Sequence, residues 1–271
     1  MFAIGGKTDI NHPSRKSPLI AISGHTNDGK RVPCIVTVVY LSSPHQSLAV
    51  VPGNVFLRVT MQKYSRENPS PRFREMEAMY QQMHSEGDAI NAIEAERTFA
   101  GHSLVPHVQA IGNCIRRLQS KTLLDYGCGK AMAYEHTTGQ SPDGQTKKGL
   151  KAIWGLDEIC LYDPGYAPYQ EYPTGQYDAV ISTDVLEHIT KEDMDWVVAE
   201  ILGFAQKVVF LNMACYPAKK ILPNGENAHI TQESPGWWLD LIHGIKRSNF
   251  DFLEVLLAID DKDKNRVVAK L

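Results

Sequence analysis

The chain has 271 residues, 43% hydrophobic and 22% charged, which is usual for a globular protein with a sizeable core. Its 28 Lys and Arg against 31 Asp and Glu give a formal net charge of −3, which argues against a nucleic-acid binder that depends on clustered cations. The five cysteines are scattered without a C-x-x-C pair. They therefore predict neither a disulfide framework nor a zinc site, and favour reduced thiols in the cytoplasm.

The N-terminal part, residues 1–65, has a β-like texture. Short β-branched runs at residues 19–23, 35–41, 47–51 and 55–61 alternate with turn residues. Because isolated hairpins are marginal, we expect this β-rich extension to pack on the main domain or to form a homodimer contact. The N-terminus lacks the apolar segment of a signal peptide, and no apolar run approaches the ~20 residues of a membrane span, so no membrane association is expected.

From residue 66 to residue 271 the pattern predicts helices that alternate with strands. Helices are expected at residues 72–83, after Ser103 as N-cap, and at 131–136, 193–204 and 235–245, the last with Ser234 as N-cap. Strands are expected at residues 121–126, 159–162, 177–182 and 207–213, followed by a hairpin of 252–259 with 266–271. Residues 139–149 and 217–234 are predicted loops. This alternation predicts an α/β fold whose sheet is mostly parallel, with one antiparallel strand at the C-terminal end.

The strongest local signal is the run LLDYGCG at residues 123–129. Gly127 and Gly129 directly follow a buried strand, where glycine allows backbone to come close to a ligand. The helix that follows would aim its free N–H groups at that ligand. A dinucleotide-binding pattern does not fit, because Met132 stands where a small residue is needed and Asp163 comes too late for the ribose-binding acid.

This run resembles the first motif of the class I S-adenosylmethionine-dependent methyltransferases. Two further segments follow in the expected order: CLYDP at residues 160–164, and YDAVISTDVLEHI at residues 177–189. The second is similar to the fourth-strand motif of the small-molecule branch, including quinone-biosynthesis methylases. The C-terminal hairpin matches the family's reversed last strand. The resemblance covers about residues 72–271 and implies a Rossmann-like methyltransferase sheet with S-adenosyl-L-methionine as cofactor.

The resemblance also implies cofactor-binding roles. Asp163 would bind the ribose hydroxyls, and the backbone at Gly127 and Gly129 would approach the methionine part. Asp125 would face the amino group or the sulfonium. Thr183 and Asp184 would end the strand that carries the reaction face.

The chain departs from the family's pattern at two places. Ala131 replaces the usual third glycine of the first motif. Only 13 residues separate Asp163 from Tyr177, which is too few for a helix and a further strand. We therefore expect the third-strand edge of the sheet to be missing or vestigial.

Two histidines are candidate general bases, since imidazole titrates near neutrality. His188 follows the fourth-strand motif, and its alternative interpretation is a histidine bonded to backbone. His229 lies in the long loop at residues 217–238, which we expect to form the acceptor pocket with one of Trp237 and Trp238 lining it. Tyr80, His84, Phe99 and His102 are further candidates for ligand contact, although amphipathic packing is the simpler interpretation. No metal ligands are assigned.

We therefore expect methyl transfer from S-adenosylmethionine to an oxygen, nitrogen or carbon atom of a small-molecule acceptor. Two alternatives remain open. The first is a nucleic-acid or protein methyltransferase, of which the charge balance disfavours the nucleic-acid version. The second is a non-catalytic S-adenosylmethionine-binding protein that acts by interaction through its N-terminal extension.

Overall fold

The computed structural model describes residues 48–51, 55–58 and 63–271. Contacts divide the chain into two units, residues 1–61 and 62–271. In the first unit β1 (Leu48–Val51) pairs antiparallel with β2 (Val55–Arg58), at two of the predicted strands. The predicted strands at residues 19–23 and 35–41 lie outside the described residues. The domain boundary after residue 65 and the homodimer contact remain predictions.

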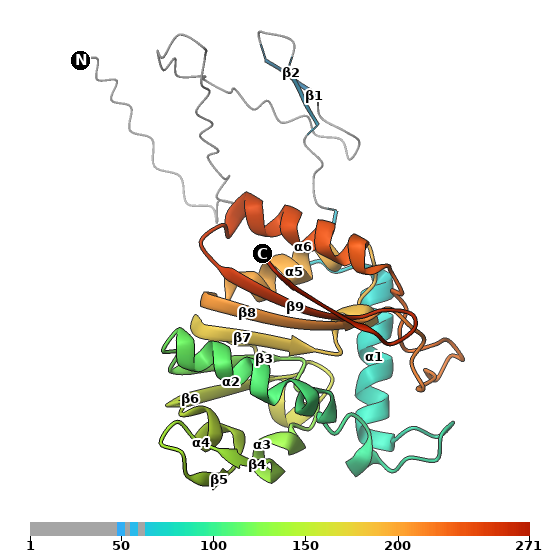
Figure 1. Ribbon diagram of the computed structural model, residues 1–271. Coiled ribbons are helices and arrows are strands. Elements are labelled where there is room, and N and C mark those ends of the chain that lie inside the picture. Colours follow the sequence, from blue (N-terminus) through green and yellow to red (C-terminus); the bar gives the residue numbers. More distant parts are fainter. Residues whose placement is uncertain (1–47, 52–54, 59–62) are drawn as a thin grey trace, which may run out of the picture. The chain divides into compact units, whose positions relative to one another are not determined.

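The second unit is a mixed α/β structure built on a six-stranded sheet in the order β10-β9-β8-β7-β3-β6 (Figure 1). Its strands are β3 (Thr122–Tyr126), β6 (Glu158–Tyr162), β7 (Tyr177–Thr183), β8 (Ala205–Ala214), β9 (Glu254–Asp260) and β10 (Arg266–Lys270). All neighbouring strands pair in parallel except β9 and β10. The predicted mostly parallel sheet with an antiparallel C-terminal hairpin is confirmed, and the arrangement is compatible with a Rossmann-like fold.

The edge strands of the six-stranded sheet are β6 and β10. At one edge, no described strand lies beyond β6, and the connection to β7 contains only the short 3-10 helix η3 (Ala167–Tyr169). This agrees with the expectation that the short segment before Tyr177 leaves no room for another strand. At the other edge, β9 pairs directly with β8 and β10 is outermost.

Helices cover both faces of the sheet (Figure 1). One face packs against α5 (Met194–Gly203) and α6 (Pro235–Asn249), and the other against α2 (Val108–Arg117) and α4 (Leu150–Trp154). Alternate side chains of one strand serve the two cores, because successive strand residues point to opposite faces. Leu124 belongs to the α5 and α6 side and Leu123 to the other, and both are fully buried. Ser234 caps α6 as predicted, its Oγ accepting from the N–H of Trp237.

Two local predictions are wrong. Ser103 does not cap a helix: it lies inside the 3-10 helix η2 (His102–His107), and its hydroxyl instead lies near the backbone oxygen of Thr183. Residues 139–149 are not a simple loop. They fall largely in a small hairpin of β4 (Thr138–Gln140) and β5 (Thr146–Lys148), followed directly by α4. The hairpin turn is closed by Asp143, which accepts from Ser141 and Gln145, contacts that periodicity does not reveal.

α1 (Pro71–Glu86) crosses the edge of the sheet at which the parallel strands end (Figure 1). Its first turn is capped by Ser70, whose Oγ accepts from the N–H of Phe73 at 3.0 Å. Met76, Met79 and Met83 lie on one face at helical spacing, as predicted. They pack against buried residues of the loop after β8, Leu222 and Ala228. The helix therefore closes the carboxyl edge of the sheet rather than either of its faces.

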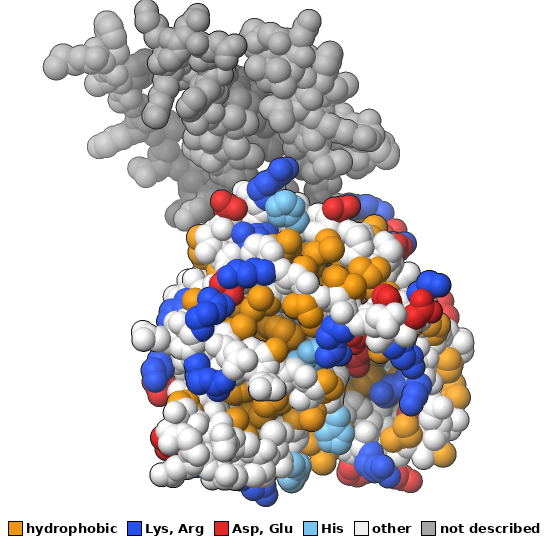
Figure 2. Space-filling view, in the orientation of Figure 1, with side chains coloured by type: hydrophobic (Ala, Val, Ile, Leu, Met, Phe, Trp, Pro, Cys, Tyr) orange, Lys and Arg blue, Asp and Glu red, His pale blue; other side chains and the backbone are white. Residues whose placement is uncertain are grey.

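The remaining elements are short: the helix α3 (Met132–His136) and the 3-10 helices η1 (Ala95–Arg97) and η4 (Leu186–His188). Among the described residues, the helices are too short or too polar to cross a lipid bilayer. On the face shown in Figure 2, Lys and Arg side chains are spread among acidic and uncharged ones.

The segment before α1 is anchored to the sheet by Arg66. Its guanidinium pairs with Glu200 on α5 and donates to the hydroxyl of Tyr126 at 2.7 Å. The side chains of Arg66 and Glu200 are 26% and 11% exposed, so the pair is largely withdrawn from water. Hydrogen bonds to charged groups contribute about 1.5–3 kcal/mol to stability, and leaving a buried charged group without its partner costs more than that.

We expect Arg66→Met to lower the free energy of unfolding by about 2 kcal/mol, because Glu200 loses its cationic partner and keeps only the hydroxyl donors of Tyr126 and Tyr172. Urea denaturation measures this change, with Arg74→Met, an exposed arginine on α1, as the matched control. Adding Glu200→Gln to Arg66→Met should recover part of the loss. Equal stability of the Arg66 and Arg74 variants would show that this anchor contributes nothing.

Candidate active site

A cavity of about 620 Å³ lies at the carboxyl ends of the parallel strands. Its walls come from the turns after β3, β6, β7 and β8, from α1, and from residues 97–103. Parallel strands end at the same edge of a sheet, and ligands of open α/β sheets bind there. Seven of the eight predicted site residues line the cavity: Gly127, Gly129, Asp163, Thr183, Asp184, His188 and His229. The eighth, Asp125, is not among the lining residues.

The glycine turn after β3 is shaped by close approach of the protein's own chain. Gly127 and Gly129 have φ of +85° and +58°, in the left-handed region that favours glycine. A Cβ on Gly127 would lie 2.4 Å from Cγ2 of Val185, and one on Gly129 would lie 2.4 Å from the carbonyl oxygen of Phe99. Both glycines are therefore required by the fold itself, whatever the cavity binds.

The expected free N–H groups at the start of α3 are partly used within the protein. The N–H of Lys130 donates to the carbonyl of Phe99 at 2.8 Å, and that of Met132 to Ala100 at 3.0 Å. The helix itself has only five residues. The prediction that these N–H groups face a ligand is wrong for these two, because residues 99–100 lie across the turn. Backbone of Gly127 and Gly129 still lines the cavity.

Asp163 joins the end of β6 to this turn. Its Oδ2 accepts from the N–H of Gly129 at 2.7 Å and its Oδ1 from that of Gly165 at 2.9 Å. Burial raises the pKa of this carboxyl, and the two backbone donors oppose that effect. Each carboxylate oxygen has a second lone pair, so both backbone bonds leave capacity for a hydroxyl group in the cavity. His84 on α1 lies 3.8 Å from Oδ1, and burial lowers its pKa to about 4.

Asp125 lies beneath the turn, with 2% of its surface exposed. Its Oδ2 accepts from the hydroxyl of Tyr134 at 2.8 Å, and its Oδ1 has no partner among the described residues. Burial raises the pKa of this carboxyl from 3.8 to about 7. Asp125 is not among the residues that line the cavity. Its predicted contact with the amino group or sulfonium of a cofactor stays a prediction.

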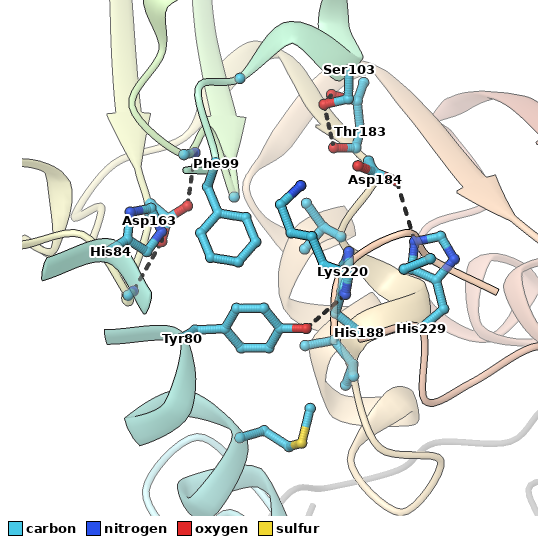
Figure 3. A pocket seen from close by; sticks show the side chains of 18 of the residues that line it. Tyr80, His84, Phe99, Ser103, Asp163, Thr183, Asp184, His188, Lys220 and His229 are labelled. Carbon is cyan, nitrogen blue, oxygen red and sulfur yellow. Dashed lines mark hydrogen bonds and ion pairs between the residues drawn. The ribbon is translucent and has the colours of Figure 1, made fainter. Parts of the chain in front are cut away.

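The other end of the cavity is formed by Asp184, His188 and His229 (Figure 3). Asp184 follows β7 with φ of +61°, and its side chain is 45% exposed. Its Oδ1 lies 3.6 Å from Nε2 of His229, and the two imidazole rings meet edge to face at 4.8 Å.

Each histidine is oriented by a backbone carbonyl. Nδ1 of His188 lies 2.8 Å from the carbonyl oxygen of Ala228, and Nδ1 of His229 lies 2.6 Å from that of Tyr216. His188 is thus bonded to backbone, as one interpretation expects, and it also lines the cavity, as a candidate base would. Burial lowers its pKa to about 4, so it is neutral at physiological pH.

Several site residues were missed or underrated by sequence reasoning. Tyr80, His84, Phe99 and His102 all line the cavity, so ligand contact and packing are not alternatives for them. The Tyr80 hydroxyl lies 2.7 Å from Nδ1 of His188. The only sequence signal for Tyr80 was its place on the apolar face of α1.

Two further ionisable side chains, Lys220 and Glu187, lie beside the end of the cavity that contains Asp184. Lys220 lines it, with its ammonium 5.1 Å from the centre of the Phe99 ring. Glu187 is fully buried next to Asp184, and burial raises its pKa well above the usual range. The lone Glu187 in the fourth-strand motif offered no signal of burial.

The loop after β8 contributes to the cavity through its two ends, residues 216–220 and His229. Its middle turns back on itself, with Asn227 bonded to the backbone of Ala218 in both directions. The prediction that one of Trp237 and Trp238 lines the pocket is wrong. Trp238 is fully buried in the core on the α5 and α6 side, and Trp237 packs against that core.

Comparison with protein-family models, curated proteins and solved structures finds no match for this chain. The geometry of the cavity is therefore the basis of the functional argument.

We expect stability to depend on pH through Asp125. Its raised pKa means that between about pH 4 and pH 7 the folded state keeps a proton that the unfolded state has lost. The contribution of Asp125 to the free energy of unfolding should fall as pH rises through this window. His84 and His188, whose pKa values burial lowers to about 4, contribute in the opposite direction, so the comparison with Asp125→Asn isolates the carboxyl. Asp125→Asn should remove this contribution and gain a few kcal/mol over the unmodified chain at pH 8, since one pKa unit corresponds to about 1.4 kcal/mol. Urea denaturation of both proteins from pH 4 to 8 tests it, and parallel pH profiles would contradict it.

Proposed function

We propose that this protein transfers a methyl group from S-adenosyl-L-methionine to a small-molecule acceptor, on a class I methyltransferase fold. One observation carries the proposal. A single cavity brings the glycine turn and Asp163 to one end and Asp184, His188 and His229 to the other (Figure 3). Its volume of about 620 Å³ is within the usual ~300–1,000 Å³ of small-molecule sites.

The donor would lie at the end formed by the glycine turn. Asp163 has unused acceptor capacity for the two ribose hydroxyls, and the backbone of Gly127 and Gly129 lines the same wall. The methyl donor is an already activated sulfonium, so the protein has to align the donor carbon with the acceptor atom and exclude water. α1 and residues 97–103 supply the cover over this end.

The acceptor would lie at the end formed by the histidines. Among them His229 is the better general base, because the Asp184 carboxylate 3.6 Å from its Nε2 stabilises the positive charge that develops on the imidazole. His188 has its pKa lowered to about 4 by burial, which makes it a weaker base near neutrality. His188 and Tyr80 would then position the acceptor rather than take its proton.

The first test is cofactor binding by calorimetry with S-adenosylhomocysteine. We expect affinity in the micromolar range and a loss of about 5- to 150-fold in Asp163→Ala, because hydrogen bonds to the ribose hydroxyls contribute about 1–3 kcal/mol. Asp157→Ala, an exposed aspartate before β6, is the matched control. Thermal denaturation of each variant separates lost binding from lost folding. Absence of binding by the intact chain would rule out the methyltransferase proposal.

The second test follows transfer of labelled methyl groups to pooled cellular metabolites. We expect His229→Ala to lower the transfer rate by about 100-fold or more, because it removes a general base. Affinity for S-adenosylhomocysteine should change little, since the donor end of the cavity is formed by other residues. His243→Ala, an exposed histidine on α6, should transfer at the unmodified rate.

The outcomes of this assay also separate the alternatives. Label found only in added nucleic acid or protein would show that the acceptor is a macromolecule and not a small molecule. Cofactor binding without any transfer would favour a non-catalytic binding protein.

A further inference from the structure

We propose that Asp184, His188 and His229 form a binding site for one divalent first-row transition-metal ion. One potential ligand atom from each residue lies within 4.8 Å of the other two. The three side chains come from the end of β7, from η4 and from the loop after β8, and they gather at one end of the cavity (Figure 3). This inference does not depend on methyl transfer being the reaction, but an ion bound at Nε2 of His229 would take the lone pair that the general-base role requires.

The contact between His229 and Asp184 is the central observation. Nδ1 of His229 lies 2.6 Å from the carbonyl oxygen of Tyr216, which can only accept, so this nitrogen carries a proton. In the neutral ring the lone pair of Nε2 then faces Oδ1 of Asp184 at 3.6 Å, and two acceptors face each other. That distance exceeds the usual ~2.7–3.2 Å of an N–H···O hydrogen bond. It is close to the ~3.3 Å between two ligands of a tetrahedral zinc ion bound at about 2.0–2.1 Å.

His188 is prepared in the same way. Its Nδ1 lies 2.8 Å from the carbonyl oxygen of Ala228 and 2.7 Å from the hydroxyl of Tyr80. The carbonyl can only accept, whereas the hydroxyl can accept from Nδ1 and donate to the same carbonyl at 3.2 Å. All three groups are satisfied when Nδ1 carries the proton, which leaves the lone pair on Nε2. Nε2 has no hydrogen-bond partner among residues 63–271. Metal-ligating histidines usually donate their other N–H to a carbonyl or carboxylate in this manner, which fixes the tautomer and the ring orientation.

Two neutral imidazoles and one carboxylate are a ligand set suited to zinc and to other first-row divalent ions. The carboxylate also offsets part of the ion's charge. The three ligands line a cavity, so the remaining coordination positions would face it and could take water or an oxygen of a bound molecule. An ordinary Asp–His ion pair is the competing explanation, and it requires His229 to be protonated.

The test uses the untagged full chain, freed of metal with a chelator and titrated with Zn²⁺ against a chromogenic competitor. We expect one zinc ion per chain, and a higher melting temperature when zinc is present, because an ion that binds only the folded state stabilises it. Asp184→Asn, His188→Ala and His229→Ala should each weaken binding by at least about 10- to 100-fold. His243→Ala and the exposed His102→Ala should bind as the unmodified chain does. His102 is a demanding control, because it lines the same cavity without belonging to the three ligands.

Asp184→Asn keeps the test decisive if a histidine variant fails to fold, because this side chain is partly exposed and its replacement has nearly the same shape. Absence of saturable binding at one ion per chain would overturn the proposal. So would equal affinity in Asp184→Asn and the unmodified chain, or an equal loss in His243→Ala. Because the readout is metal affinity, its failure leaves the cofactor-binding test of the proposed function untouched.

Discussion

The site depends on the partly buried carboxylate of Asp163. By accepting the N–H groups of Gly129 and Gly165, it joins the turn after β3 to the segment after β6. These strands are neighbours in parallel register, so the two turns leave the sheet side by side and need a polar link between backbone groups that would otherwise be unpaired. The remaining walls of the cavity are placed against this joined pair of turns.

The segments that cover the cavity, residues 97–103 and α1, are held in place by backbone hydrogen bonds as well as by side-chain packing. Residues 99–100 bond to the start of α3, and α1 rests through its methionines on the loop after β8. Phe99, Tyr80 and His188 then make successive aromatic contacts across the middle of the cavity. The same contacts that stabilise the cover therefore also line the cavity between its Asp163 end and its Asp184 end.

The Asp184 end contrasts with the Asp163 end in how its polar atoms are satisfied. Asp163 has a backbone donor on each oxygen, whereas Oδ1 of Asp184 lies 3.6 Å from Nε2 of His229, beyond ordinary hydrogen-bond distance. The two histidines have their Nδ1 atoms directed at carbonyls of the chain, so their Nε2 atoms are the reactive ones. In both proposed roles this end takes a positive centre, either a proton accepted from a substrate or a metal ion.

The sequence by itself determined the α/β alternation, the mostly parallel sheet, the shortened edge at β6, and the turn residues that line the cavity. Those features follow from local periodicity, from glycine after a buried strand, and from chain length, since 13 residues cannot form a further strand and its crossover. Only the tertiary structure decided that Asp125 lies beneath the turn, that Trp238 belongs to the core, and that Tyr80 meets His188. Asp184 and His188 meet His229 because β7 and β8 are adjacent in the sheet and the loop after β8 folds back over their ends. Pairing between strands and the path of a long loop depend on contacts remote in sequence, and no local pattern encodes them.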